Sequence, residues 1–199
     1  MALQQGLVGV QNASDGSFPL TQRFGQQGDS IVSPLHGRYY ETTVRGNQFG
    51  ITGGLATTTA AGAATFTGLC VVNPAGSGFN MAVNKVFIAQ PIALTAETEL
   101  GVMYGASVAA GALTTIFNRL AGGRASVCTA SAGLSLTAAM TAFIVISSGG
   151  TAVQPIVHAH DFEGSLIIPP GYTLASYTSR VTTTAVMFCF NWEEVPIIR

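Results

Sequence analysis

The sequence predicts an all-β protein whose short strands form a sandwich or a barrel. One observation is a series of short apolar segments, with turn residues between them, at near-regular spacing. The other is the stretch Leu69–Ala89, in which two apolar runs flank a turn that contains Pro74, Gly76 and Gly78. Glycine permits positive φ and proline presets a turn, so this stretch is typical of a β-hairpin. Repeated strand and turn signals of this kind indicate a sandwich or a barrel.

The second run of this hairpin also predicts an irregularity. Met81 and Val83 point to one side and Ala82 and Asn84 to the other, until the alternation slips near Lys85. Because successive side chains of a strand alternate between faces, such a slip indicates a β-bulge.

The last apolar run, Val186–Trp192, is the clearest strand. It places Phe188, Phe190 and Trp192 on one face, which predicts that these three aromatics lie in the core. Glu193-Glu194 are expected to end this strand as solvated charges. The other predicted strands are Thr65–Thr67, Gly101–Val108, Ala142–Ser147, Gln154–His158, Gly164–Ile168 and Thr173–Thr178.

One segment is a candidate helix. Leu113, Ile116, Phe117 and Leu120 fall at helical spacing, and Gly122-Gly123 follow as a stop signal. Three consecutive β-branched residues within the segment oppose this prediction.

The chain divides into two parts by pattern. Residues 1–50 carry little periodic apolar pattern and many Gln, Gly and Ser residues, which predicts an extended N-terminal arm with loops. Residues 51–199 contain the strand signals and form the β-domain. The arm either lies across a neighbouring subunit or wraps its own subunit.

The most informative feature of the composition is its lack of charge. Asp, Glu, Lys and Arg make up 9% of the 199 residues, whereas typical globular domains have about 25%. A monomer needs a charged surface to stay soluble, so we expect an oligomer or a larger assembly. The net charge of −1 leaves no basic stripe for nucleic acid. Ala125–Ser148 lacks the sustained hydrophobicity of a membrane-spanning helix.

The N-terminus and the cysteines indicate synthesis and folding in a cytoplasm. The start MALQQGLVGVQ lacks the basic and apolar regions of a signal peptide. Cys70, Cys128 and Cys189 are far apart in the sequence and sit among apolar or small residues, which predicts reduced, packed thiols. Their spacing matches no zinc motif.

The segment His36–Arg45 is the densest polar and aromatic cluster. Tyrosine and arginine anchor interfaces because each combines contact area with a polar end. We therefore predict an interface formed by Arg38, Tyr39, Tyr40 and Arg45. The alternative is an edge strand whose exposed face carries the charges.

Candidate chemistry is sparse. His158 and His160 lie two residues apart, with Asp161 and Glu163 close by, so on a strand both imidazoles would face one ion. The segment resembles the first metal motif of cupins, but Glu163 follows too closely and Leu174 occupies the place of a third histidine. We therefore expect no metal site, no cofactor and no enzyme activity. Catalytic triads and the Glu97/Glu99 and Glu193/Glu194 pairs gave weaker signals still.

A set of motifs, taken together, resembles tailed-bacteriophage virion proteins. The motifs are HGRYYE at residues 36–41, NPAGSGFN at 73–80, AGGRAS at 121–126, IIPPGY at 167–172 and NWEEVPI at 191–197. The resemblance implies a jelly-roll β-sandwich with a structural role in the virion.

The resemblance does not say which virion role applies. Our interpretation is a capsid decoration or cement protein that forms a homotrimer on the major capsid protein. The alternatives are a neck, tail or head-fibre component. Outside the group, a carbohydrate-binding jelly roll and a degenerate cupin enzyme remain open.

Overall fold

The computed structural model describes residues 39–53, 56–58, 65–106, 109–136, 140, 142–152 and 157–197. The chain splits into two compact units, Met1–Tyr40 and Glu41–Arg199, and the second contains the β-structure described below. The predicted arm up to residue 38 therefore lies outside the described residues.

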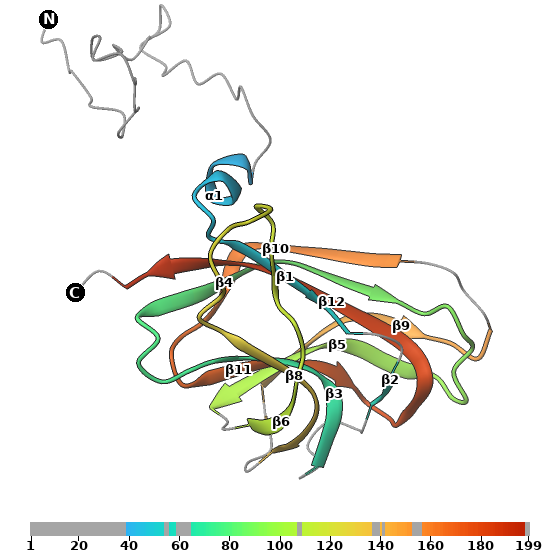
Figure 1. Ribbon diagram of the computed structural model, residues 1–199. Coiled ribbons are helices and arrows are strands. Elements are labelled where there is room, and N and C mark those ends of the chain that lie inside the picture. The colour runs from blue at the N-terminus through green and yellow to red at the C-terminus, as the bar shows by residue number, and fades with distance from the viewer. Residues whose placement is uncertain are drawn as a thin grey trace, which may run out of the picture. The chain divides into compact units, whose positions relative to one another are not determined.

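The described part of the chain is almost entirely β-structure with one short helix (Figure 1). The elements are α1 (Tyr40–Val44), β1 (Gln48–Thr52), β2 (Ala56–Thr58), β3 (Thr65–Asn73), β4 (Phe79–Ala89), β5 (Thr98–Ala106), β6 (Ala109–Leu113), β7 (Phe117–Asn118), β8 (Thr129–Leu136), β9 (Ala142–Gly149), β10 (Val157–Ile168), β11 (Tyr172–Thr178) and β12 (Thr182–Pro196).

The strands form two antiparallel sheets that pack face to face, which confirms the predicted β-sandwich. Sheet 1 has the order β10-β4-β12-β1-β7, with β2 also paired to β12, and sheet 2 has the order β6-β8-β3-β11-β5-β9. In Figure 1, sheet 1 runs across the upper part of the sandwich and sheet 2 across the lower part.

Eight of these strands have the connectivity of a jelly roll. Leaving out β2, β6, β7 and β8, the first strand pairs with the last (β1 with β12), and the second with the second last (β3 with β11). The third pairs with the third last (β4 with β10), and the two middle strands, β5 and β9, pair with each other. This is one long hairpin wrapped into two sheets, as in double-sheet jelly rolls.

The segment between β5 and β9 closes one side of the sandwich. Its strands β6 and β8 extend sheet 2 beyond β3, whereas β7 pairs with β1 at the edge of sheet 1. The segment therefore covers the β1 and β3 side of both sheets, and it includes the AGGRAS motif.

The core lies between the sheets and confirms the aromatic face predicted for the last strand. Phe188, Phe190 and Trp192 are 2%, 0% and 0% exposed. The indole of Trp192 stacks on the ring of Phe49 from β1, with 6.1 Å between ring centroids. Sheet 2 contributes Leu174 and other apolar side chains from the opposite side.

The predicted bulge is confirmed, and a second one lies beside it. The pairing of β12 with β4 shifts register where Asn191 faces Lys85 and Trp192 faces Val83, which leaves Asn84 as the extra residue. On the other side of β4, the register of β10 shifts between Asp161 and Leu166.

One local prediction is wrong, and one alternative is excluded. The candidate helix around Leu113–Leu120 is instead the end of β6, a connection and β7. Phe117 and Leu120 are 40% and 38% exposed, so a helix here would have no apolar face buried against the rest of the protein. Conversely, part of His36–Arg45 forms α1 rather than an edge strand.

The end of α1 has a clear local cause. Gly46 has φ of 69°, its N–H donates to the carbonyl of Thr43, and the N–H of Asn47 donates to the carbonyl of Thr42. This pair of bonds is a Schellman motif, which ends helices at glycine. β1 follows directly and pairs with β12, so the compact unit begins at Glu41, ahead of the boundary at residue 50 that the sequence pattern indicates.

Candidate interaction surface

Four of the five motif segments meet at one end of the sandwich. The side-chain amide of Asn73, in NPAGSGFN, donates to the carbonyls of Phe79 and Ile168, both at 2.9 Å. The N–H of Gly171, in IIPPGY, donates to the carbonyl of Asn73, and the N–H of Ile197 to that of Gly78. The turns after β3 and β10 and the end of β12 are therefore joined by hydrogen bonds.

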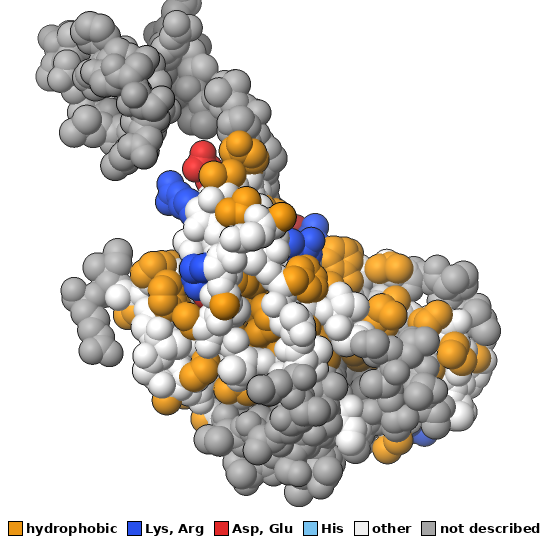
Figure 2. Space-filling view, in the orientation of Figure 1, with side chains coloured by type: hydrophobic (Ala, Val, Ile, Leu, Met, Phe, Trp, Pro, Cys, Tyr) orange, Lys and Arg blue, Asp and Glu red, His pale blue; other side chains and the backbone are white. Residues whose placement is uncertain are grey.

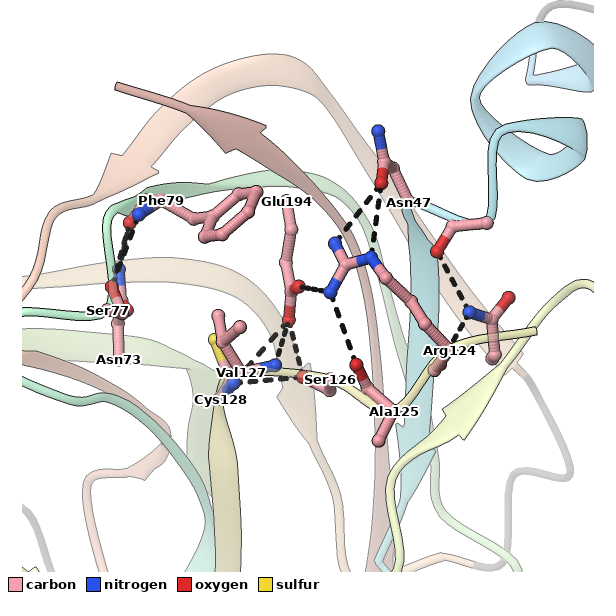
Figure 3. Close-up of polar contacts among 12 residues, drawn as sticks. Asn47, Asn73, Ser77, Phe79, Arg124, Ala125, Ser126, Val127, Cys128 and Glu194 are labelled. Carbon is pink, nitrogen blue, oxygen red and sulfur yellow. Dashed lines mark hydrogen bonds and ion pairs between the residues drawn. The ribbon is translucent and has the colours of Figure 1, made fainter. Parts of the chain in front are cut away.

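The AGGRAS segment reaches this end through Arg124. Its Nη1 lies 2.7 Å from Oε2 of Glu194 on β12, and its Nη2 donates to Oδ1 of Asn47 at 3.1 Å. The guanidinium also lies over the rings of Phe49 and Phe79, at 4.9 and 5.2 Å from their centroids. Figure 3 shows the guanidinium between Asn47 and Glu194. Arg124 thus ties the β7–β8 connection to sheet 1.

Glu194 is fully buried, so the prediction that it would be a solvated strand-end charge is wrong. Its Oε1 accepts hydrogen bonds from the hydroxyl of Ser126 and from the N–H of Val127. A buried carboxylate is tolerated only when it is paired and hydrogen-bonded, and these groups meet that need. β12 also continues past Glu194 and ends at Pro196.

This cluster holds elements together rather than performing a reaction. Its single carboxylate already receives a cation and two donors, and its cation is packed between aromatic rings. Sequence reasoning missed Arg124 and Glu194. One sequence signal was available, because no charged residue lies between Arg124 and Asp161. An isolated charge at the start of such a stretch is more often paired with an opposite charge than left without a partner.

The predicted interface residues are only partly brought together. Arg38 lies outside the described residues, Tyr39 is half-buried and Tyr40 is 47% exposed at the start of α1. Arg45 is exposed and lies 3.8 Å from Glu41 one helical turn away.

Arg45 also acts on β12. Burial raises the pKa of Glu193, and the positive charge of Arg45 opposes this rise. On the face of the molecule drawn in Figure 2, most charged side chains gather around α1.

The outer face of sheet 1 carries apolar side chains on three neighbouring strands, beside the charged residues Lys85 and Asp161. Two cross-strand rows that point away from the core are apolar across β10, β4 and β12: Val157, Ala89 and Met187, then Ala159, Phe87 and Cys189, and the second row ends at the exposed Thr52 on β1. Val157 is 61% exposed. We call these six residues the sheet 1 patch.

The outer face of sheet 2 differs. There, Cys70, Met103 and Ala175 are buried in a second apolar cluster that includes Met140 and Tyr177. The described residues form no comparable buried cluster over sheet 1.

The histidines lie on β10, the outermost strand of sheet 1, opposite Ile88 and Val86. Asp161 follows His160 directly, so its carboxylate points to the other face. There it pairs with Lys85 at 3.4 Å and accepts the N–H of Glu163. Among the described residues no group of three ligands suitable for a metal ion occurs.

The three cysteines are free thiols. Burial raises the pKa of Cys70 and of Cys128 to about 12, and the nearby charge of Glu194 adds to the rise at Cys128. Both therefore remain protonated at neutral pH. Cys189 is partly exposed in the sheet 1 patch.

No helix within the described residues has the length and apolar character needed to cross a membrane. The chain matches no protein-family profile, no curated protein and no solved structure.

Proposed function

We propose that this chain is a non-enzymatic structural protein of a phage virion. In this proposal it is a capsid decoration or cement protein that binds the major capsid protein as a homotrimer and stabilises the shell. The phage setting rests on the motif resemblance. The structural role is supported by one observation, the uncharged apolar patch on an outer face of a jelly roll.

The patch supports assembly for a physical reason. Antiparallel sheets in a sandwich bury one face and present polar side chains to water on the other. In β4 and β12 of this chain, apolar residues occupy both faces, as in Val86–Ala89 and Val186–Phe190. Contiguous apolar surface on a soluble protein marks an interaction site. Many weak contacts of this kind, repeated over a shell, add up through multivalency.

The clustering of the motif segments supports the same role. Arg124 and Asn73 fix three connections and the end of β12 against one another. A rigid end of the sandwich loses little conformational entropy on binding, which favours contact with another protein surface.

Light scattering coupled to size exclusion tests the oligomer, and cosedimentation with capsids that lack decoration tests the partner. We expect a discrete species of three chains that saturates the shells and raises the temperature at which they break. A monomer that does not bind shells would contradict the proposal. Trimers that bind purified necks, tails or fibres but not shells would show instead that the protein is another virion component.

A carbohydrate-binding role has less support. Sugar grooves need exposed aromatic side chains, and the single tryptophan, Trp192, is 0% exposed. Among the residues whose side chains the structure describes, the exposed aromatics Tyr40, Phe117 and Tyr172 lie on α1, β7 and β11 and belong to no common surface row.

A further inference from the structure

Strand β9 is the last strand of sheet 2, and within the described residues it pairs with β5 alone. The carbonyl oxygen of Ile144 points to β5, because it lies 2.0 Å from a Cβ added at Gly101. The C=O and N–H of one trans peptide point in opposite directions, so the N–H of Val145 points to the free edge. Val145 is also 46% exposed.

This edge lacks charge and proline, which protect the free edges of most sheets. Ala142–Gly149 contains no charged residue and no proline, and Ile144, Val145 and Ile146 are β-branched. An edge without such protection is a template for another strand. The register shift of β9 leaves Ile146 as the extra residue, so Ala142–Val145 keep regular pairing with β5.

Strand β10, which ends sheet 1 on one side, is protected. It carries Asp161 and Glu163, and its register shifts between Asp161 and Leu166. Glu163 has a positive φ of 53° within this irregular stretch. Charges and a bulge oppose pairing along an edge. Of these two edges, β9 is therefore the one that can accept an added strand.

We infer that β9 pairs antiparallel with β9 of a second copy of this chain, about a two-fold axis at Ile144. In this register, Val145 of each copy lies opposite Phe143 of the other, and its N–H donates to the carbonyl oxygen of Phe143. The axis forms this bond twice, and sheet 2 continues from one copy into the other. The inference goes beyond the proposed function and does not rest on it.

A second copy fits this edge better than an unrelated strand does. Under a two-fold axis, an antiparallel edge is its own complement, so donors and acceptors match on both sides. Ile144 and Ile146 are half-buried and pack against the core between the sheets. A strand with a charge at this position would place it beside that core without an opposite charge, whereas β9 brings none. The two Ile144 side chains instead meet as a cross-strand pair.

Val145→Pro tests the contact, because it removes the N–H that donates across the axis. That N–H points away from β5, and proline is tolerated at such an edge position, so sheet 2 itself keeps its pairing. Self-association should weaken about tenfold or more, since two hydrogen bonds are lost. Val145→Ala keeps the N–H and should associate about as tightly as the native chain.

Val145→Lys places a charge on the same edge and should weaken self-association to a similar extent. The matched control, Val157→Lys, makes this change on β10, where Val157 is 61% exposed and belongs to the sheet 1 patch. It should leave self-association unchanged. In the proposed function it should weaken binding to shells, which Val145→Lys should not affect.

Sedimentation equilibrium gives the dissociation constants, and circular dichroism verifies that each variant is folded. The native chain should form two-chain species with rising concentration, or six-chain species where the chains are trimers. Hydrogen exchange provides a readout on the native chain. The N–H of Val145 should exchange rapidly in dilute protein and slowly where the chains are paired.

A native chain that does not self-associate would overturn the inference, as would folded Val145→Pro and Val145→Lys variants that associate as tightly as the native chain. Equal weakening by Val145→Ala and Val145→Pro would also overturn it, because the side chain would then hold the contact. Protection of the Val145 N–H only after shells are added would overturn it too, and would assign the edge to a capsid protein. Native chains that pair through β9 but do not bind shells would contradict the proposed function alone.

Discussion

Arg124 and Glu194 form the interaction on which the most local structure depends. Glu194 is 0% exposed at its side chain and Arg124 is 35% exposed, so the carboxylate depends on its partner far more than the guanidinium does. Removing one partner of a buried pair leaves the other charge desolvated and unpaired.

We predict that Arg124→Ala lowers the free energy of unfolding by about 3 kcal/mol. Arg45→Ala is the matched control, because its pair with Glu41 is 71% and 69% exposed. It should cost less than about 0.5 kcal/mol. Urea denaturation measures both.

The double variant Arg124→Ala/Glu194→Gln tests the reason for this loss. It should be more stable than Arg124→Ala, since the buried charge has been removed together with its partner. A double variant less stable than Arg124→Ala would show that lost packing, not the unpaired carboxylate, explains the effect.

The thiols should divide into one reactive and two inert groups. With a pKa of about 12, Cys70 and Cys128 have about one thiolate in ten thousand at pH 8, and both are buried. In dilute native protein we expect a disulfide reagent to modify Cys189 alone. Raising the pH to 10 should leave the other two unmodified unless the protein unfolds. Three fast thiols in the folded protein would contradict this assignment.

Among the strands, β5 and β9 pack closely where their register shifts at Gly101. A Cβ added at Gly101 would lie 2.0 Å from the carbonyl oxygen of Ile144, which is backbone and cannot move aside. Gly101→Ala should therefore lower the free energy of unfolding by about 3 kcal/mol.

Gly76, in the β3–β4 turn, has φ of 81° and nothing within 4 Å of an added Cβ. Gly76→Ala should cost about 1 kcal/mol, the penalty of left-handed backbone alone. Thermal unfolding monitored by circular dichroism compares the two variants. Equal losses would refute the clash at Gly101.

Strands with large apolar residues could be predicted from the sequence, whereas strands of small residues could not. Val186–Trp192 and the hairpin with its bulge near Lys85 carry strong alternation, and both are confirmed. β8, with the sequence TASAGLSL, and β6, with AAGAL, have little side-chain signal. They form because their backbones pair with β3 and with each other.

The helix α1 was missed although its local signals are present. Glu41 and Arg45 are four residues apart, an arrangement that supports a helix, and Gly46 supplies the end. Tyr39 and Tyr40 before Glu41 and the β-branched residues Thr42–Val44 between Glu41 and Arg45 favour a strand, which is why an edge strand was the alternative for this segment. The burial of Glu194 gave no local sequence signal, because its partner is seventy residues away on another element.

At the scale of the whole molecule, the last strand is central to the fold. β12 lies between β4 and β1 in sheet 1 and supplies Trp192, Phe190 and Phe188 to the core. Without β12, β1 loses the long strand with which it pairs, and the space that the three aromatic side chains of β12 fill in the core is left empty.

We predict that a chain ending at residue 184 does not fold. It should lack a cooperative thermal transition and be degraded rapidly by a protease, while the full chain resists. A truncated chain that keeps a sharp transition would show that the other strands form a stable sandwich without β12.

This arrangement has a consequence for the order of events during translation. At about 5–20 residues per second, the ribosome makes β1 roughly 7–30 seconds before it completes β12. Throughout that time β1 has no long partner and the sheet 1 patch does not exist, because two of its six residues belong to β12. In the proposed role, association through the sheet 1 patch therefore needs the finished chain, because a nascent chain that lacks β12 does not present this surface. We expect recruitment into larger particles to be restricted to complete subunits.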